Sequence, residues 1–256
     1  EGGTSVNHSE VIFRSKGVRG PYIPYEKNPI LTQRHLDPKR KNPISSVGHA
    51  DLVEGPDGNT NAVFLGVRPY EGDFYNTGRE TFIAPVKWID DWPIINPDHD
   101  EVQYKYEVNW KEEKYKDELP VTGNFDLKIP FIDSLNSQFL FLRTDDPTWY
   151  NFKENKNALT VKLLPGTILE KGNPAFIGRR QQHLVSSAST EMEFSAKKDN
   201  EKAGMVIFQN ENHFYYMCKS SDKGEDVIQL FKGSQTSNEM ELLKQVTLPK
   251  SERKIY

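Results

Sequence analysis

The sequence predicts an all-β protein, and three observations lead to this prediction. The apolar segments are short and are separated by turn signals rich in Gly, Pro, Asn and Asp. No segment in the first part of the chain keeps the helical period of 3.6 over about ten residues. Residues 62–67 are apolar on both alternating faces, which is typical of a strand covered on both sides. With 256 residues, the chain is long enough for two domains, each with its own core.

Residues 1–104 form the first predicted β region. Its apolar runs are closed by turn signals such as Gly20-Pro21 and the Gly-Pro-Asp-Gly sequence at 55–58. The predicted strands and extended segments cover residues 11–15, 28–32, 49–53, 62–67, 81–88 and 92–95. Residues 105–123 are rich in Lys, Glu and Tyr, and we interpret them as a linker. A solvated helix is the alternative there, because residues 110–114 have tolerable helix propensity.

Residues 124–256 form the second predicted β region. Many short strands separated by turn-rich connectors indicate a β-sandwich. The chain stops at residues 254–256 in what resembles the start of a further strand, so we expect this domain to be truncated. The predicted strands cover residues 139–142, 159–163, 190–194, 205–208, 214–217, 227–231 and 241–246.

Composition and charge exclude several classes of partner. The net charge is −4 with acids and bases interspersed, so we expect neither nucleic acid nor an anionic membrane surface as a partner. No apolar run approaches the ~18 residues that a transmembrane helix needs. Cys218 is the only cysteine, which excludes a disulfide within the chain, and its strand-like setting predicts a buried, inert thiol. The compartment stays open: cytoplasmic, periplasmic and secreted locations of a bacterial type all fit.

Arg79 is the first candidate site residue. It lies beside Gly78 at the start of a predicted strand, after a loop dense in Tyr, Asn and carboxylates, and this composition suits a pocket for a polyhydroxylated ligand. A planar, permanently charged guanidinium gives several hydrogen bonds in a fixed fork, which suits sugar hydroxyls. The alternative is a surface ion pair between Arg79 and Glu80 or Glu71.

Two other groups of polar residues give little indication of a functional site. Arg179 and Arg180 form a short basic pair in an acidic chain, which is weak evidence for phosphate recognition. Four histidines lack the spacing of metal ligands, so no zinc site is expected from them. They are His35, His99, His183 and His213.

Several motifs, in order along nearly the whole chain, give the sequence a family resemblance. Each motif is weak alone, but together they resemble glycoside hydrolase family 43, in particular its β-xylosidase and α-L-arabinofuranosidase members. The matching segments lie at residues 1–4, 14–16 with 20–22, 28–32, 48–53, 76–81, 92–96, 141–144 and 174–183.

The resemblance implies a β-propeller with five blades followed by a concanavalin A-like β-sandwich. We expect residues 1–104 to be the last blades, 105–123 a linker and 124–256 a truncated sandwich. The implied reaction is hydrolysis of terminal β-D-xylosyl or α-L-arabinofuranosyl residues of xylan-derived oligosaccharides with inversion, which needs two carboxyl groups ~6.5–9.5 Å apart. In the family these groups are an Asp and a Glu, with a second Asp that tunes the acid. All three are expected upstream of residue 1, so no catalytic residue is expected in this chain.

The resemblance assigns substrate contacts to two residues. Arg79 corresponds to the arginine that contacts the innermost sugar. His49 corresponds to a histidine at the pocket floor that binds an ordered water or, in some relatives, a cation. No cofactor is required, although the resemblance allows a structural calcium ion, bound through water at His49. The expected partners are a xylo- or arabino-oligosaccharide and the missing N-terminal part of the same enzyme, and His8 is expected to be structural.

Two other functions compete with this one. In a self-sufficient enzyme, Glu71, Asp73 or Glu80 would provide the acid and base, but an incomplete propeller would expose open sheet edges. In a non-catalytic carbohydrate-binding module, a β-sandwich would present exposed aromatic residues such as Trp149 and Tyr150.

Overall fold

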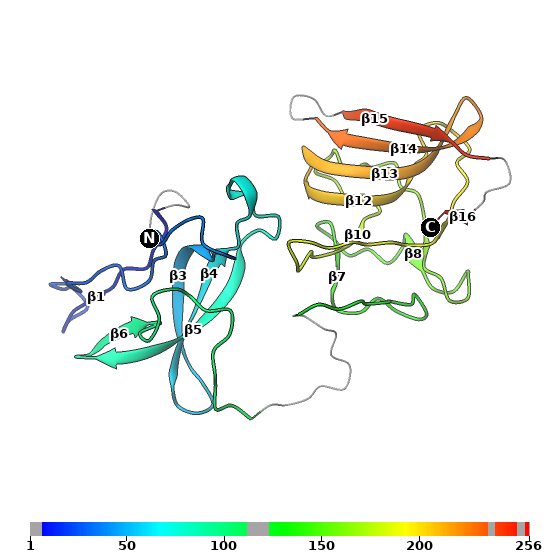
Figure 1. Cartoon of the computed structure of the whole chain (residues 1–256). Coiled ribbons are helices and arrows are strands. Elements are labelled where there is room, and N and C mark those ends of the chain that lie inside the picture. Colours follow the sequence, from blue (N-terminus) through cyan, green and yellow to red (C-terminus); the bar gives the residue numbers. More distant parts are fainter. Residues whose placement is uncertain (1–6, 112–122, 235–238, 250–253, 256) are drawn as a thin grey trace. The chain divides into compact units, whose positions relative to one another are not determined.

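A computed structural model describes residues 7–111, 123–234, 239–249 and 254–255 of the chain (Figure 1). The described residues contain no α-helix, so the expected all-β class is confirmed. None of their helical segments has the length and apolar character to cross a membrane. The chain forms two compact units: the first comprises Glu1–Phe125 and Gln181–Ser186, and the second Asp126–Arg180 and Ser187–Tyr256.

The first unit is built on an antiparallel sheet of four strands in sequence order. The strands are β3 (Ser45–Glu54), β4 (Thr60–Val67), β5 (Glu80–Ile89) and β6 (Trp92–Ile95). A small pair, β1 (Phe13–Arg14) and β2 (Ile23–Pro24), accompanies this sheet, and an isolated bridge joins Glu10 to Leu31. Strand β4 lies between β3 and β5, and most of its residues are buried, as expected for a strand covered on both faces.

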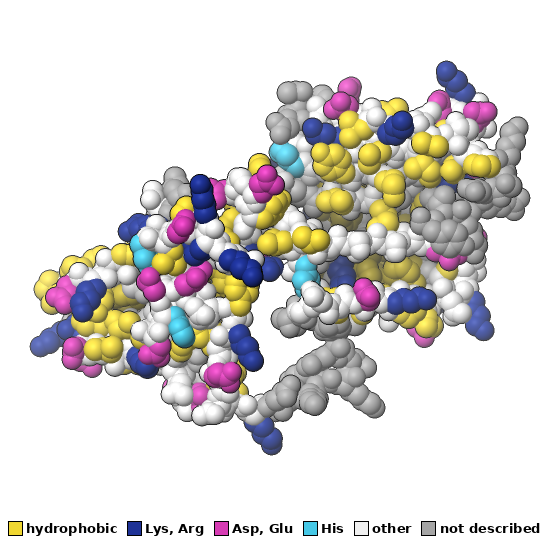
Figure 2. Space-filling model, in the orientation of Figure 1, with side chains coloured by type: hydrophobic (Ala, Val, Ile, Leu, Met, Phe, Trp, Pro, Cys, Tyr) yellow, Lys and Arg dark blue, Asp and Glu magenta, His cyan; other side chains and the backbone are white. Residues whose placement is uncertain are grey.

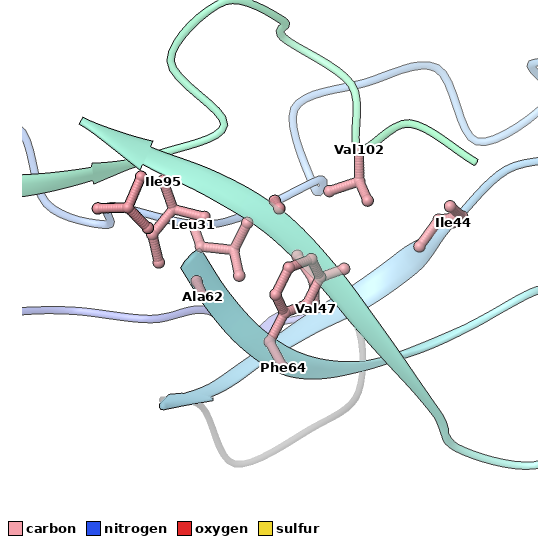
Figure 3. Close-up of a cluster of buried hydrophobic side chains, with 9 residues drawn as sticks. Leu31, Ile44, Val47, Ala62, Phe64, Ile95 and Val102 are labelled. Atoms are coloured by element: carbon pink, nitrogen blue, oxygen red, sulfur yellow. The ribbon is translucent and has the colours of Figure 1, made fainter. Parts of the chain in front are cut away.

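A compact apolar cluster stabilises the first unit (Figure 3). Phe64 of β4 is at its centre and stacks on Phe82 of β5 with ring centroids 6.1 Å apart. Each fully buried aliphatic or aromatic side chain of this kind contributes roughly 1.5–3 kcal/mol of transfer free energy. The buried members are Leu31, Ile44, Val47, Ala62, Phe64, Ala84, Val86, Ile95 and Val102.

The second unit contains a four-stranded antiparallel sheet and three short strand pairs. The sheet has the order β12 (Ala203–Asn210), β13 (His213–Asp222), β14 (Glu225–Gly233) and β15 (Met240–Thr247). Lys223 and Gly224 link β13 to β14 with φ values of 52° and 84°, the conformation that a two-residue hairpin turn requires. The short pairs are β7 (Phe139–Phe141) with β10 (Ile177–Arg179), β8 (Tyr150–Asn151) with β9 (Thr160–Val161), and β11 (Met192–Glu193) with β16 (Lys254–Ile255).

Two predictions for the second unit concern the exposure of single side chains, Cys218 and Trp149, and only the one for Cys218 is confirmed. Cys218 is buried, with 1% of its surface exposed, which confirms the predicted burial of this thiol. The expectation of an exposed Trp149 is wrong, because only 3% of its surface is exposed. Its ring packs edge-on against Phe141 at 5.8 Å and against Tyr150 at 5.1 Å, and Tyr150 is itself only half-exposed. These two aromatic residues form part of a packed cluster and do not offer an open stacking platform.

Some predictions of the organisation fall outside the described residues. The Glu-Gly-Gly-Thr motif at residues 1–4 and most of the predicted linker, residues 112–122, are among them. The described linker residues 105–111 contain neither strand nor helix. The predicted domain limits at 104/105 and 123/124 stay predictions.

Candidate functional site

Strand β3 is irregular around His49. It pairs regularly with β4 from Asp51 to Glu54, but its register shifts between Ser45 and Gly48 and again between Gly48 and Asp51. His49 has a φ of 57°, in the left-handed region that residues other than glycine seldom adopt. Bulges of this kind re-aim a side chain and are frequent beside active sites. Accordingly, the His49 side chain is exposed although its neighbours in the strand, Val47 and Gly48, are buried.

Two side chains from the N-terminal segment hold this irregular part of β3. The His8 Nδ1 atom donates to the Ser46 carbonyl oxygen at 2.8 Å. The Glu10 Oε2 atom accepts a hydrogen bond from the Ala50 backbone N–H, also at 2.8 Å. The two bonds bracket His49, and each satisfies a backbone group that the interrupted ladder leaves without a strand partner. His8 thus has the structural role that the sequence predicts for it.

Gly48 is required by close packing against the same segment. A Cβ atom at this position would lie 2.9 Å from His8 Cε1, 3.0 Å from His8 Nε2 and 3.0 Å from the Ser9 carbonyl oxygen. These separations are well inside the ~3.5–4.0 Å of ordinary contacts between carbon atoms. A glycine therefore allows the imidazole of His8 to lie directly on the backbone that carries His49.

The loop between β4 and β5 carries Arg79 and is closed at its base by an ion pair. Arg68 follows the last residue of β4, and Glu80 is the first residue of β5. Arg68 Nε and Nη2 donate to the two carboxylate oxygens of Glu80, each at 2.7 Å. Thr77 Oγ1 adds a third hydrogen bond to Glu80 Oε1 at 2.9 Å. The bonds to Glu80 raise the pKa of Arg68 above its ordinary value, against the opposing effect of burial.

Arg79 is left without an ion-pair partner by this arrangement. Successive side chains of a strand point to opposite faces, and the Glu80 carboxylate is already occupied by Arg68. Arg79 is exposed, and within the described part of the chain it forms no ion pair. The alternative surface pair with Glu80 or Glu71 is therefore absent from these residues. The guanidinium is available for a ligand.

A distant segment of the chain contacts the same loop. Residues Gln181–Ser186 belong to the first unit. The Gln182 carbonyl oxygen accepts a hydrogen bond from Arg68 Nη2 at 3.0 Å, and the Leu184 carbonyl oxygen accepts one from Asn76 Nδ2 at 3.1 Å. His183 Nε2 donates to the Gly123 carbonyl oxygen at 2.8 Å. No sequence pattern indicates these contacts, because two of the acceptors are backbone atoms more than a hundred residues away from their donors.

The loop that carries Arg79 also has exposed aromatic side chains. Tyr70, Phe74 and Tyr75 are exposed, and Phe74 most of all, with 66% of its surface accessible. The Tyr70 N–H donates to the Phe74 carbonyl oxygen at 2.8 Å, and the two rings lie 6.3 Å apart. Exposed aromatic rings on the same loop as a charged hydrogen-bond donor suit a ligand with both apolar and hydroxyl-bearing faces.

His49 and Arg79 lie near one row of the sheet. Gly48 of β3 is in register with Leu65 of β4, and Leu65 is in register with Thr81 of β5. His49 is thus one residue, and Arg79 two residues, from the same row across three strands. A cavity of about 220 Å³ lies in this part of the chain, lined by Glu10, Val11, Ile12, Ile30, Ala50, Leu52 and Ile95. That volume is smaller than the ~300–1,000 Å³ of ordinary ligand sites, and neither His49 nor Arg79 is among the lining residues.

Charged groups near the site do not form a metal centre. The described residues bring together no group of three or more His, Cys, Asp or Glu side chains that could hold a metal ion. Calcium also takes backbone carbonyl oxygens and waters as ligands, so the calcium ion near His49 stays a prediction. On the face shown in Figure 2, acidic and basic side chains of the first unit are interspersed without a basic stripe.

The candidate acids of a self-sufficient enzyme are poorly placed for the task. Glu80 is committed to Arg68 and Thr77 through both of its oxygens. Glu71 and Asp73 lie on the short 3-10 turn η2 (Glu71–Asp73), where both side chains are exposed. General acid catalysis at neutral pH needs a carboxyl group whose surroundings favour the protonated form, and an open surface turn does not provide them.

Comparison with known proteins identifies the family. A family model described as "Glycosyl hydrolases family 43" matches residues 1–93, and one described as "Beta xylosidase C-terminal Concanavalin A-like domain" matches residues 131–256. The chain is 36% identical over 226 residues to a "Xylosidase/arabinosidase" of Butyrivibrio fibrisolvens, covering 87% of this chain and 42% of that protein. It is 35% identical over 233 residues to the "Non-reducing end alpha-L-arabinofuranosidase BoGH43B" of Bacteroides ovatus, covering 91% of this chain and 42% of that protein.

Solved structures agree with these relatives. A GH43_12 protein retrieved from a capybara gut metagenome superposes with a TM-score of 0.82 at 30% identity, covering 99% of this chain and 47% of that one. The GH43 protein BlXynB from Bacillus licheniformis gives a TM-score of 0.82 at 29% identity, covering 97% of this chain and 46% of that one. The chain therefore spans less than half the length of the relatives that it matches. The resemblance seen in the sequence motifs is confirmed, and the chain belongs to glycoside hydrolase family 43.

Proposed function

We propose that this chain is part of an inverting exo-glycosidase that removes terminal β-D-xylosyl or α-L-arabinofuranosyl residues from xylan-derived oligosaccharides. In this proposal the first unit contributes blades of a five-bladed β-propeller. The names of the relatives, xylosidase, arabinosidase and arabinofuranosidase, support this substrate class. The observation that carries the proposal is the exposed Arg79, whose neighbouring carboxylate is occupied by Arg68.

Arg79 and His49 position the sugar in this mechanism. The guanidinium donates up to five hydrogen bonds in a rigid fork, so it can hold adjacent hydroxyls of one sugar ring. His49, fixed on a strained backbone, offers a second polar contact from β3. Preorganised donors act most strongly when charge develops at the reacting centre, because they need no reorganisation at that moment. Neither residue transfers the proton.

The acid and the base come from elsewhere in the proposed enzyme. They are an Asp and a Glu, assisted by a second Asp, on segments ahead of residue 1. Inversion requires that a water molecule fit between the base and the anomeric carbon, which sets the two carboxyl groups ~6.5–9.5 Å apart. A calcium ion held through water near His49 is part of the proposal, but no step depends on it.

The test uses the complete gene product that contains this chain. We expect it to hydrolyse an aryl β-D-xyloside or an aryl α-L-arabinofuranoside, and NMR of the first product should show the anomer opposite to that of the substrate. Release of the retained anomer, or no turnover of either substrate, would overturn the proposal. Turnover by the 256-residue chain alone would contradict the placement of the carboxylates.

Substitution of Arg79 tests the sugar contact. We expect Arg79→Ala to lower kcat/KM by about 10²–10³-fold, the range for loss of one preorganised donor. Arg19→Ala is the matched control, because Arg19 is an exposed arginine of the same unit with no hydrogen bond or ion pair among the described residues. Equal kcat/KM values for the two variants would remove Arg79 from the site.

A non-catalytic carbohydrate-binding module remains as the second candidate, with less support. The buried Trp149 and half-buried Tyr150 remove the stacking platform on which that function depended. Calorimetric binding of xylan by the complete gene product without turnover would favour it.

A further inference from the structure

We infer that Arg68 and Glu80 are positioning residues for Arg79: their ion pair closes the base of the 69–79 loop and fixes the direction in which Arg79 leaves the sheet. The inference rests on the proposed contact between Arg79 and the sugar. Neither residue is assigned a part in the reaction, and neither touches the substrate in this proposal.

The ion pair joins the two ends of the loop. Gly66 and Glu80 are the last residue pair in register between β4 and β5, so the loop leaves the sheet where Arg68 and Glu80 stand. Inside the loop, backbone hydrogen bonds connect Tyr70 with Phe74, Asp73 with Tyr70 and Gly78 with Tyr75. Beyond that last register pair, the Arg68–Glu80 pair is what links the end of β4 to the start of β5.

The pair is suited to fix geometry. Both nitrogen–oxygen distances are 2.7 Å, and two N–H groups of one guanidinium donate to the two oxygens of one carboxylate. A bidentate pair of this kind defines an orientation as well as a distance. The side chains of Arg68 and Glu80 are only 19% and 25% exposed, so solvent and salt screen them less than a surface pair.

The pair also protects Arg79 from a competing partner. Glu80 is covalently adjacent to Arg79, and both oxygens of its carboxylate are held by Arg68. If loss of Arg68 loosened the loop end, the two side chains would no longer be kept on opposite faces, and the freed Glu80 could pair with Arg79 and draw the guanidinium away from the sugar. Arg68 therefore has two effects, orientation of the loop and occupation of Glu80, and both favour the same position of Arg79.

Residues Gln181–Ser186 support Arg68 from a third direction. The Gln182 carbonyl oxygen accepts a hydrogen bond from the same Nη2 atom that binds Glu80. Asn76 of the loop donates to the Leu184 carbonyl oxygen, so the segment contacts the loop at two points. An edge-on contact between His183 and Phe125, with centroids 5.2 Å apart, further anchors this segment. Arg68 thus cannot swing away from Glu80 without losing an additional bond.

The experiment measures kcat/KM on an aryl β-D-xyloside and the melting temperature for variants of the complete gene product. We expect Arg68→Ala to lower kcat/KM by about 10–100-fold, because small displacements of a positioning group have effects of this size. Arg68→Lys keeps the charge but not the forked pair of donors. On a logarithmic scale, we expect this variant to regain less than half of the kcat/KM that Arg68→Ala loses. Glu80→Gln preserves the shape of the pair and serves if Arg68→Ala does not fold.

Arg40→Ala is the matched structural control. Arg40 forms a comparable ion pair with Glu101 in the same unit, at 2.5 Å with side chains 14% and 38% exposed. We expect it to lower the melting temperature as much as Arg68→Ala does and to change kcat/KM by less than about threefold. Equal losses of kcat/KM in the two variants would overturn the inference, because they would show a general effect of destabilisation.

A double-mutant cycle separates positioning from other roles. If Arg68 acts through Arg79, then Arg68→Ala has no further effect on kcat/KM in an Arg79→Ala background. Independent, additive losses would overturn the inference. An unchanged kcat/KM in Arg79→Ala itself would refute the proposed function instead. In that case hydrogen exchange still tests whether Arg68 orders the loop. Arg68→Ala should accelerate the exchange of amides in residues 69–79 about tenfold, and Arg40→Ala should not.

Discussion

Substitution of Gly48 by alanine tests how His49 is held. The added Cβ atom would lie 2.9 Å from His8 Cε1 and 3.0 Å from both His8 Nε2 and the Ser9 carbonyl oxygen. Relief requires a shift of about 0.5 Å or more at each contact, given ordinary separations of ~3.5–4.0 Å. The imidazole cannot move away freely, because its Nδ1 atom is bonded to Ser46. Forced overpacking of this kind costs about 1–3 kcal/mol.

Hydrogen exchange localises the effect. In the 256-residue chain, we expect amides of β3 (Ser45–Glu54) to exchange about 5- to 150-fold faster in Gly48→Ala, the factor that corresponds to 1–3 kcal/mol. Hydrogen exchange reports the change strand by strand, whereas a global unfolding transition would average it over both units. Gly17→Ala is the control, since its Cβ would meet nothing nearer than 3.8 Å.

The double variant identifies the clashing group. His8→Ala removes two of the three short contacts of the new Cβ but leaves the Ser9 carbonyl oxygen. We expect it to recover part of the loss in Gly48→Ala, although it costs protection in the wild-type background because Ser46 loses its donor. Exchange rates for Gly48→Ala that match those for Gly17→Ala would refute the argument.

Three further predictions concern single side chains. Glu10→Ala should speed exchange of the Ala50 amide, while Glu10→Gln, which keeps an acceptor oxygen, should do so much less. Trp149→Ala should destabilise the second unit by about 3–5 kcal/mol in denaturant titration, because its side chain is buried. Truncation of an exposed aromatic side chain would change the stability little. Burial raises the pKa of the Cys218 thiol from 9.0 to about 11. The unfolded chain therefore loses this proton first, so the titration of Cys218 leaves stability unchanged below about pH 9 and lowers it between about pH 9 and 11. Cys218→Ala should flatten that part of the profile.

The sequence predicts the long strands and several short ones, such as β7, β9 and β11, and misses β2, β8 and β10 for a physical reason. Strands β4, β5 and β12–β14 have eight to ten residues each, which is long enough for the apolar pattern to reveal them. Strands β2 and β8 have two residues each, too few to express a period, and depend on partners elsewhere in the chain. The exposure of Trp149 was mispredicted because composition does not tell whether an aromatic side chain in a turn-rich stretch packs inward.

The candidate site likewise contains residues that the sequence predicts and residues that it does not. Motifs single out His49 and Arg79, because the residues beside each contact are contiguous in sequence. Several of the contacts that hold His49 and Arg79 in place join residues that are far apart in the sequence. His8 and Glu10 reach across 38 and 40 residues to β3, and Arg68 reaches across 114 residues to Gln182. A single sequence contains no record of such pairings, because they follow from the tertiary fold.

The two proposed sugar contacts, His49 and Arg79, are held in the same way, and this affects specificity. An exposed side chain is carried on backbone that departs from the regular sheet, a bulge for His49 and a loop end for Arg79, and buried or half-buried side chains hold that backbone. Removal of Arg79 deletes a contact that a xyloside and an arabinofuranoside both need, so Arg79→Ala should lower kcat/KM for both by similar factors. Substitution of Arg68 moves the contact instead. Because pyranose and furanose rings place their hydroxyls differently, Arg68→Lys should change the ratio of the two kcat/KM values, and an unchanged ratio would show that the loop end tolerates the displacement.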